Sequence, residues 1–160
     1  MITVPIFRLR AKANPLGRQV GVIYVDDAVQ HGLGRGVVFR VLMKGSGLSE
    51  GDHGFHLHEF PDLRPSRKKG KTVTGGSAGS HYDPQNTGSH RGPYRRGHLG
   101  DLPRIYADRH GNVDDLVVAP RLRMADCIGR SLIVHRGGDN YTDNPPNGGG
   151  EARVIGGVIP

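Results

Sequence analysis

Residues 81–101 read HYDPQNTGSHRGPYRRGHLGD, and the rest of the chain is best understood from this stretch. It holds three histidines and one carboxylate: His81, His90, His98 and Asp101. Zinc accepts imidazole nitrogen and carboxylate oxygen, and a structural zinc site usually has four protein ligands. The glycines and the proline between them break any helix or strand, so the chain can turn back and bring four side chains to one point. Taken alone, the stretch is equally compatible with a polar surface loop that carries incidental histidines.

Four segments that precede this stretch have the pattern of β-strands. In residues 6–13 apolar side chains alternate with Arg8, Arg10 and Lys12, which is typical of a strand with one solvated face. The predicted strands are residues 6–13, 19–27, 36–46 and 51–60. In the last of them Phe55 and Leu57 share one face, while His56 and His58 share the other.

Four more strands are predicted after it, at residues 102–107, 113–119, 128–135 and 153–159. In 128–135, Leu132 and Val134 share one face and His135 lies on the other. Eight strands without a credible long helix suit a small closed or flattened antiparallel barrel, an all-β fold. Two long irregular segments, 61 to about 100 and 136–152, interrupt the pattern, and loops of that length are uncommon unless they are functional.

Composition narrows the class of protein. The 160 residues suit a single domain over 1–160, and 26 glycines indicate many tight turns. The net charge of +7 suggests an anionic partner, which could be nucleic acid, a membrane surface or a small anion. No apolar run reaches the roughly 20 residues that span a bilayer. Cys127 is the only cysteine, so an intrachain disulfide and a CxxC metal site are both excluded.

The first 13 residues, MITVPIFRLRAKA, do not look like a signal peptide. Pro5, Arg8 and Arg10 interrupt the apolar run that such a leader needs. We therefore expect a cytoplasmic protein, with export as the alternative if a leader was removed beforehand.

Five motifs in order resemble the Cu,Zn superoxide dismutase family, and GDLPRIY and GGDNYTDNP resemble its bacterial branch. The motifs are GFHLHEF (54–60), GGSAGSHYDP (75–84), HRGPYRRGHLGDLP (90–103), IGRSLIVH (128–135) and GGGEARVIGGVI (148–159). The resemblance covers about residues 17–160. It implies an eight-stranded antiparallel Greek-key β-barrel or sandwich with two long functional loops. It also implies a homodimer that acts on superoxide and binds neither nucleic acid nor membrane.

Carried over motif by motif, the resemblance implies a copper ion and a zinc ion that share one ligand, His81, as a bridging imidazolate. The implied copper ligands are His56, His58, His81 and His135, and the implied zinc ligands are His81, His90, His98 and Asp101. Four imidazoles in a flattened arrangement suit Cu(II), and a tetrahedral nitrogen–oxygen set suits zinc.

The resemblance also assigns residues that bind no metal. Asp139 would orient His56 and His90 through hydrogen bonds. Arg153 would guide the anion to the copper. In the implied reaction copper alternates between two oxidation states, and one superoxide leaves as dioxygen and the next as peroxide. His81 would release Cu(I), take up a proton and return it, while zinc does no redox chemistry.

Two features depart from the family. Its usual disulfide between the first long loop and the last strand is absent, and we expect Gly75 and Gly156 at the matching positions. The second long loop carries Asp139, Asp143 and Glu151 against Arg136, so it does not form a positive funnel.

Two other functions stay open at this point. One is a catalytically silent metal-binding or copper-delivery module of the same fold, although the complete copper set counts against it. The other is a polyanion binder, whose candidate residues are Arg64, Arg67, Lys68, Lys69, Lys71, Arg95 and Arg96. No aromatic side chain lies among residues 64–71 to stack on bases, which counts against this second reading.

Overall fold

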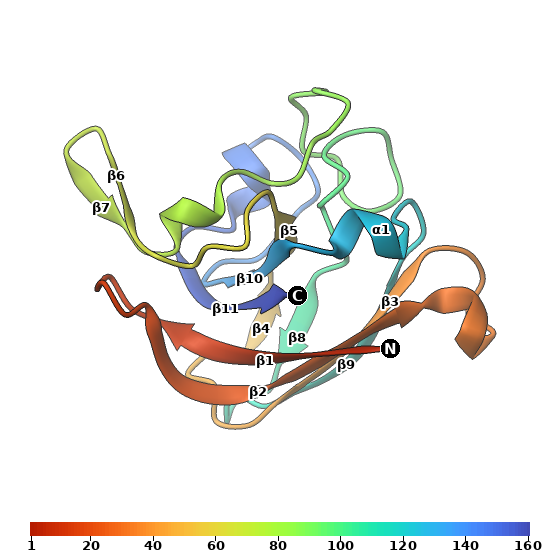
Figure 1. Ribbon diagram of the computed structural model, residues 1–160, viewed down its shortest axis with the longest axis horizontal. Helices are drawn as coiled ribbons and strands as arrows, with labels where there is room; N and C mark the ends of the chain where they lie inside the picture. The colour runs from red at the N-terminus through yellow and green to blue at the C-terminus, as the bar shows by residue number, and fades with distance from the viewer.

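The computed structural model describes all of residues 1–160, and antiparallel strands dominate it (Figure 1). The strands are β1 (Ile2–Leu9), β2 (Leu16–Asp27), β3 (Val37–Met43), β4 (Gly51–His53), β5 (Phe55–His58), β6 (Ser66–Lys68), β7 (Lys71–Val73), β8 (Ile105–Ala107), β9 (Val113–Ala119), β10 (Arg130–His135) and β11 (Arg153–Ile159). Four short helical turns connect them: η1 (Ala28–His31), η2 (Gly76–Ala78), α1 (Met124–Cys127) and η3 (Pro146–Gly149). None of the helices has the length and apolar character that crossing a membrane requires.

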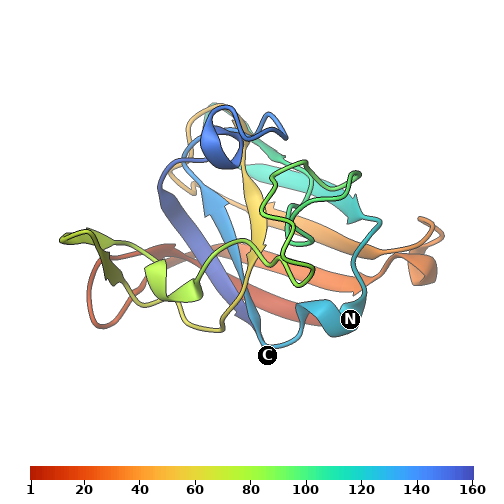
Figure 2. The ribbon, with the colours of Figure 1, turned by 90° about the horizontal axis from the view of Figure 1, so that it is seen from above.

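Seven strands form one curled sheet in the order β5-β10-β11-β1-β2-β3-β9, and β4 pairs with β8 beside it. β3 pairs with β9, and β5 pairs with β10, so the chain leaves each pair by a crossed connection of the Greek-key type. β4 runs into β5, and the N–H of Tyr106 in β8 donates to Asp115 Oδ2 of β9 at 2.7 Å. The β4–β8 pair therefore bridges the two ends of the sheet, and the strands close into the predicted all-β barrel (Figure 2).

Each of the eight predicted strands is present, with one of them divided. The predicted strand 51–60 becomes β4 and β5, which part at Gly54. The N–H of Gly54 donates to the carbonyl of Gly137, and its carbonyl accepts the N–H of His135, both at 2.9 Å. Because these bonds lead to the second long loop and to β10, β4 and β5 are free to pair with different neighbours.

Two departures from the predicted elements have local explanations. β1 ends at Leu9 rather than at residue 13, because the N–H of Arg10 bonds to the carbonyl of Pro15 and closes the turn there. In the segment predicted to be irregular, β6 and β7 form a small basic hairpin that projects from the barrel (Figure 1).

The barrel interior is one continuous apolar core. Phe55 and Leu57 of β5 and Leu132 and Val134 of β10 all contribute to it, as their alternation predicted. Phe55 packs edge-on against Phe39 with ring centroids 5.6 Å apart. Burying one such side chain contributes about 1.5–3 kcal/mol to the free energy of unfolding, so β5 and β10 are firmly held. The histidines on the opposite faces of β5 and β10 are therefore held in place as well.

A second, small apolar cluster ties the first long loop (residues 61–101) to the outside of the barrel. It consists of Leu63, Ala78 and Ile133. A Cβ placed on Gly156 would lie 3.1 Å from Leu63 Cδ2, whereas one placed on Gly75 would face Leu9 and Arg153. In the first long loop Leu63, rather than Gly75, faces Gly156, so the structure does not bring together the two positions that we expected to match the disulfide.

Candidate metal centre

The open edge of β5 is where the first long loop joins the barrel. The N–H of Leu57 donates to the carbonyl of Gly100, and the carbonyl of Leu57 accepts the N–H of Tyr82, both at 2.8 Å. These bonds pair His58 with His81 and His56 with Asp101 across the edge. A Cβ on Gly100 would lie 2.2 Å from the carbonyl oxygen of Leu57, so only glycine permits this approach.

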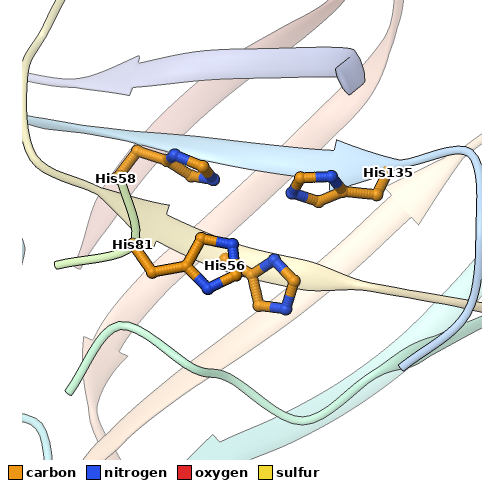
Figure 3. A group of neighbouring side chains, drawn as sticks. All are labelled: His56, His58, His81 and His135. Carbon is orange, nitrogen blue, oxygen red and sulfur yellow. The ribbon is translucent and has the colours of Figure 1, made fainter. Parts of the chain in front are cut away.

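β10 adds a fourth imidazole. In the antiparallel register Ile133 lies opposite His56, so His135, two residues further along, points to the same face as His56. The ring centroid of His135 lies 4.8 Å from that of His56 and 5.6 Å from that of His58. Figure 3 shows the rings of His56, His58, His81 and His135 gathered around one point, from β5, the first long loop and the end of β10.

Two groups of buried donor atoms result, and within each group all four atoms lie within 4.8 Å of one another. The first group is His56, His58, His81 and His135, and the second is His56, His81, His90 and Asp101. The structure thus brings together six of the residues that the sequence singled out. His98 lies beside the second group, with its Nδ1 3.2 Å from Asp101 Oδ2.

In the first group each imidazole from β5 and β10 uses one nitrogen for a hydrogen bond and leaves the other without a partner. His56 Nε2 bonds to Asp139 at 2.7 Å, His58 Nδ1 to the carbonyl of Gly79 at 2.9 Å, and His135 Nδ1 to the carbonyl of Glu151 at 3.1 Å. His56 Nδ1, His58 Nε2 and His135 Nε2 are buried and unpaired. Buried nitrogens are rarely left unpaired, and a metal-ligating histidine typically donates its other N–H in this way. These residues therefore fit a metal ion.

The second group shows the same signature. His90 Nδ1 lies 2.8 Å from Asp101 Oδ2, and His98 Nδ1 lies 3.2 Å from it, yet none of the three atoms is in hydrogen-bonding geometry. The other carboxylate oxygen, Oδ1, is 2.8 Å from His81 Nδ1. Three imidazole nitrogens and one carboxylate oxygen thus converge on a common point, as a tetrahedral zinc site needs.

His56 and His98 compete for a place in the second group on distance alone. His56 Nε2 is already bonded to Asp139, so His56 has one free nitrogen and can bind one metal ion. His98 offers an unpaired Nδ1 beside Asp101, and the ring of the first group that it contacts is that of His81, which belongs to both groups. We therefore assign His56 to the first group and His98 to the second.

Asp139, in the second long loop (residues 136–152), lies between the two groups. Its Oδ2 is 2.7 Å from His56 Nε2 and its Oδ1 is 2.7 Å from His90 Nε2. The N–H of Tyr141 also donates to Oδ1, at 2.9 Å. A single buried carboxylate thus fixes the tautomer of one histidine in each group.

Burial sets the charge of most of these groups. Burial, with His81 nearby, lowers the pKa of His56 and His58 well below the usual range and that of His135 to about 3. Burial also opposes a charge on His90, but Asp101 and Asp139 outweigh it and raise the pKa of His90 to about 9. The first group therefore offers neutral imidazoles, which is the form that binds a metal.

Asp101 stays ionised despite its burial. Burial works to raise its pKa, but the contacts with His81, His90 and His98 outweigh that effect and hold the pKa below its usual range. The second group therefore contributes one negative charge, which suits a divalent cation.

Arg153 lies opposite His135 across the β10–β11 pair. Its Nη1 donates to the carbonyl of Gly75 at 2.9 Å, and its positive charge acts on both His58 and His135. Partial burial lowers the pKa of Arg153, with Glu59 opposing this, but arginine remains charged. A fixed cation therefore stands beside the first group.

One buried histidine was not singled out from the sequence. His53 is 1% exposed, with its Nδ1 2.8 Å from the carbonyl of His135 and its Nε2 2.8 Å from the carbonyl of Ser49. It therefore supports the backbone of His135 from behind. No sequence signal separates His53 from a surface histidine, because its role depends on β10 packing across β4.

Comparison with known proteins gives consistent results over nearly the whole chain. The sequence model described as copper/zinc superoxide dismutase matches residues 20–159. A superoxide dismutase [Cu-Zn] of Brucella abortus is 48% identical over 145 residues, which cover 89% of this chain and 80% of that protein. The solved Cu/Zn superoxide dismutase from Brucella abortus superposes with a TM-score of 0.90 at 45% identity, covering 99% of this chain and 98% of the other. The monomeric enzyme of Salmonella enterica superposes with a TM-score of 0.81 at 38% identity, covering 99% and 98%.

Proposed function

The chain belongs to the copper/zinc superoxide dismutase family, and on that premise we propose which of its residues carry the reaction. It converts superoxide to dioxygen and hydrogen peroxide with copper and zinc as cofactors. The observation that supports the assignment of residues is the pair of buried donor sets, whose unpaired atoms converge on two neighbouring points. We propose further that residues 1–160 form a single domain.

Copper is assigned to the first group, His56, His58, His81 and His135. Four imidazole nitrogens suit Cu(II), and the hydrogen bonds on the opposite ring nitrogens hold three of these rings in one orientation. When bound, copper supplies the redox chemistry, since it takes an electron from one superoxide and gives it to the next.

Zinc is assigned to His81, His90, His98 and Asp101. The set has three nitrogens and one oxygen, the mixture that tetrahedral zinc accepts. His81 belongs to both sets, with Nδ1 beside Asp101 and its ring 4.0 Å from that of His56. We propose that Nδ1 stays on the zinc side, while Nε2 takes up a proton and delivers it to the peroxide product.

Arg153 is assigned to substrate binding. Superoxide is a small anion, and the guanidinium of Arg153 is held beside His58 and His135 by the carbonyl of Gly75. This hydrogen bond keeps the guanidinium of Arg153 beside the proposed copper ligands. No carboxylate lies within ion-pair distance of Arg153 to neutralise its charge.

A xanthine-oxidase-coupled superoxide assay on protein loaded with copper and zinc tests the function. We expect copper-dependent consumption of superoxide and one ion of each metal per chain. A fully loaded protein with zinc alone and no copper-dependent activity would refute the assignment. The copper-delivery alternative is not favoured, because every copper donor is kept. A salt-dependent DNA titration in parallel tests the proposal that the chain binds no nucleic acid.

The homodimer and the compartment also stay proposals. Supporting a dimer, Leu33, Tyr94 and Leu116 are exposed apolar side chains that line one hollow of about 450 Å³. The relative from Salmonella enterica is described as monomeric, so light scattering of this chain beside a Leu116→Glu variant is the needed measurement. The absence of a disulfide supports the proposal that the protein acts in a reducing compartment such as the cytoplasm. We do not propose membrane binding.

A further inference from the structure

We propose that Arg104 is a positioning residue of the metal centre, acting on Asp139 through the backbone of the second long loop and the ring of Tyr141. The inference rests on the proposed role of Asp139 as the carboxylate that orients one ligand of each metal. Arg104 follows Asp101 by three residues and immediately precedes β8, so it is fixed to the segment that delivers a zinc ligand.

Arg104 contacts the second long loop at two residues, Asp139 and Tyr141. Its Nη1 donates to the carbonyl oxygen of Asp139 at 3.0 Å, and its guanidinium carbon lies 4.6 Å from the centroid of the Tyr141 ring. The backbone N–H of Arg104 also donates to Tyr141 Oη at 3.1 Å. On its other edge the guanidinium faces Asp52, with Nε 3.6 Å from Oδ2. The planar group is therefore oriented from both sides.

Tyr141 is itself held in an uncommon position. Its backbone φ is +62°, a left-handed conformation that bulky residues rarely adopt, and its N–H donates to Asp139 Oδ1 at 2.9 Å. A Cβ on Gly92 would lie 2.6 Å from Tyr141 Cγ, so the first long loop makes room for this ring by having glycine there. The ring of Tyr94 lies edge-on to it at 6.5 Å.

These contacts join three segments around one carboxylate. Asp139 reaches His56 Nε2 with one oxygen and His90 Nε2 with the other, each at 2.7 Å. A shift of the Asp139 backbone would therefore rotate a ligand in both metal sites together. Arg104 resists that shift, because it contacts the Asp139 carbonyl and the Tyr141 ring and belongs to the same chain segment as the zinc ligand Asp101.

The test uses the copper- and zinc-loaded protein and the variants Arg104→Gln, Tyr141→Phe and Asp139→Asn. Zinc affinity by chelator competition and the Cu(II) paramagnetic resonance spectrum are measured for each. Loss of a direct outer-shell partner weakens metal binding about 10–100-fold, which is the effect expected for Asp139→Asn. We expect a smaller loss of about 3–10-fold for Arg104→Gln, with a copper spectrum shifted in the same sense. Tyr141→Phe should fall between the wild type and Arg104→Gln.

The double variant decides whether Arg104 acts through Asp139. If it does, Arg104→Gln adds little to Asp139→Asn, whereas independent effects add fully. Arg40→Gln is the matched control, since Arg40 also pairs with an aspartate and is 41% exposed like Arg104, but lies on β3 away from both sites. A wild-type copper spectrum and zinc affinity in Arg104→Gln, or full additivity, overturns the inference. A wild type that fails to hold both metals overturns the proposed assignment instead.

Discussion

Leu63 faces Gly156, although 92 residues of chain separate them: a Cβ on Gly156 would lie 3.1 Å from Leu63 Cδ2. An apolar contact thus holds the first long loop against the last strand. Leu63 is 6% exposed and packs with Ala78 and Ile133. The loop is therefore fastened by burial of apolar surface, which reduction leaves unchanged.

This contact predicts where a disulfide can be introduced. We expect Leu63→Cys combined with Gly156→Cys to oxidise spontaneously and to raise the free energy of unfolding by about 2–4 kcal/mol. Gly75→Cys with Gly156→Cys should stay reduced, since position 75 faces Leu9 and Arg153. Thiol counting and urea denaturation with and without reductant measure both variants. Closure of the second pair instead of the first would contradict the packing described above.

Removal of the metals should cost much of the stability. Asp101, His90 and His98 carry unpaired buried atoms that a bound ion would satisfy, and no disulfide limits the first long loop. Binding to the folded state alone stabilises it by about 4 kcal/mol when the ion is a thousandfold above its Kd. Calorimetry of chelated and loaded protein should show a large difference in Tm, with the loop disordered in the chelated form. A small difference would mean that packing alone holds the loop.

Reductant should have no effect on the loaded protein. Burial raises the pKa of the Cys127 thiol to about 12, so at pH 8 almost no thiolate is present to react. We expect a thiol reagent to modify Cys127 only after denaturation, and Tm and activity to be the same with and without reductant. Rapid labelling of the native protein would mean that Cys127 is accessible after all, and a lower Tm in reductant would point to a Cys127 link between two chains.

Replacement of His135 should separate the two metals. His135 belongs to the first group only, and its Nε2 is buried without a partner. We expect His135→Ala to abolish dismutation while one zinc per chain remains. His98→Ala should do the reverse, with zinc lost first. Elemental analysis beside the superoxide assay measures both, and loss of zinc from His135→Ala would show that the two sites are not independent.

The basic segments should attract the substrate. The β6–β7 hairpin carries Lys68 and Lys69 and leads into Gly75, whose carbonyl holds Arg153. Together with Arg95 and Arg96 these side chains are exposed, while the second long loop is acidic. Charged clefts raise association rates by about 10 to 10³-fold, a general range that includes enzymes of this family.

Neutralising Lys68, Lys69, Arg95 and Arg96 together should lower the rate and flatten its dependence on ionic strength, since screening then has less attraction to remove. Stopped-flow superoxide decay at several salt concentrations provides the measurement. If the salt profile of the fourfold variant matches that of the wild type, these residues serve solubility alone.

Which side chains share a face could be predicted from the sequence alone. Alternation in β5 and β10 places His56, His58 and His135 opposite the core residues Phe55, Leu57, Leu132 and Val134, because successive side chains of a strand point to opposite sides. The resemblance of the motifs to a known family singled out His81, His90, His98, Asp101, Asp139 and Arg153. Such patterns are local, so they can be recognised without knowing which distant segments are in contact.

How the segments contact one another became visible only in the folded chain. The break at Gly54, the support of His135 by His53, the contact of Leu63 with Gly156 and the clasp of Arg104 on Tyr141 all join segments remote in sequence. The same holds for the free nitrogen of each histidine, which depends on the acceptor that its other nitrogen meets after folding. A pattern within one segment cannot specify these contacts. Each contact depends on how two segments lie relative to each other, and packing alone fixes that arrangement.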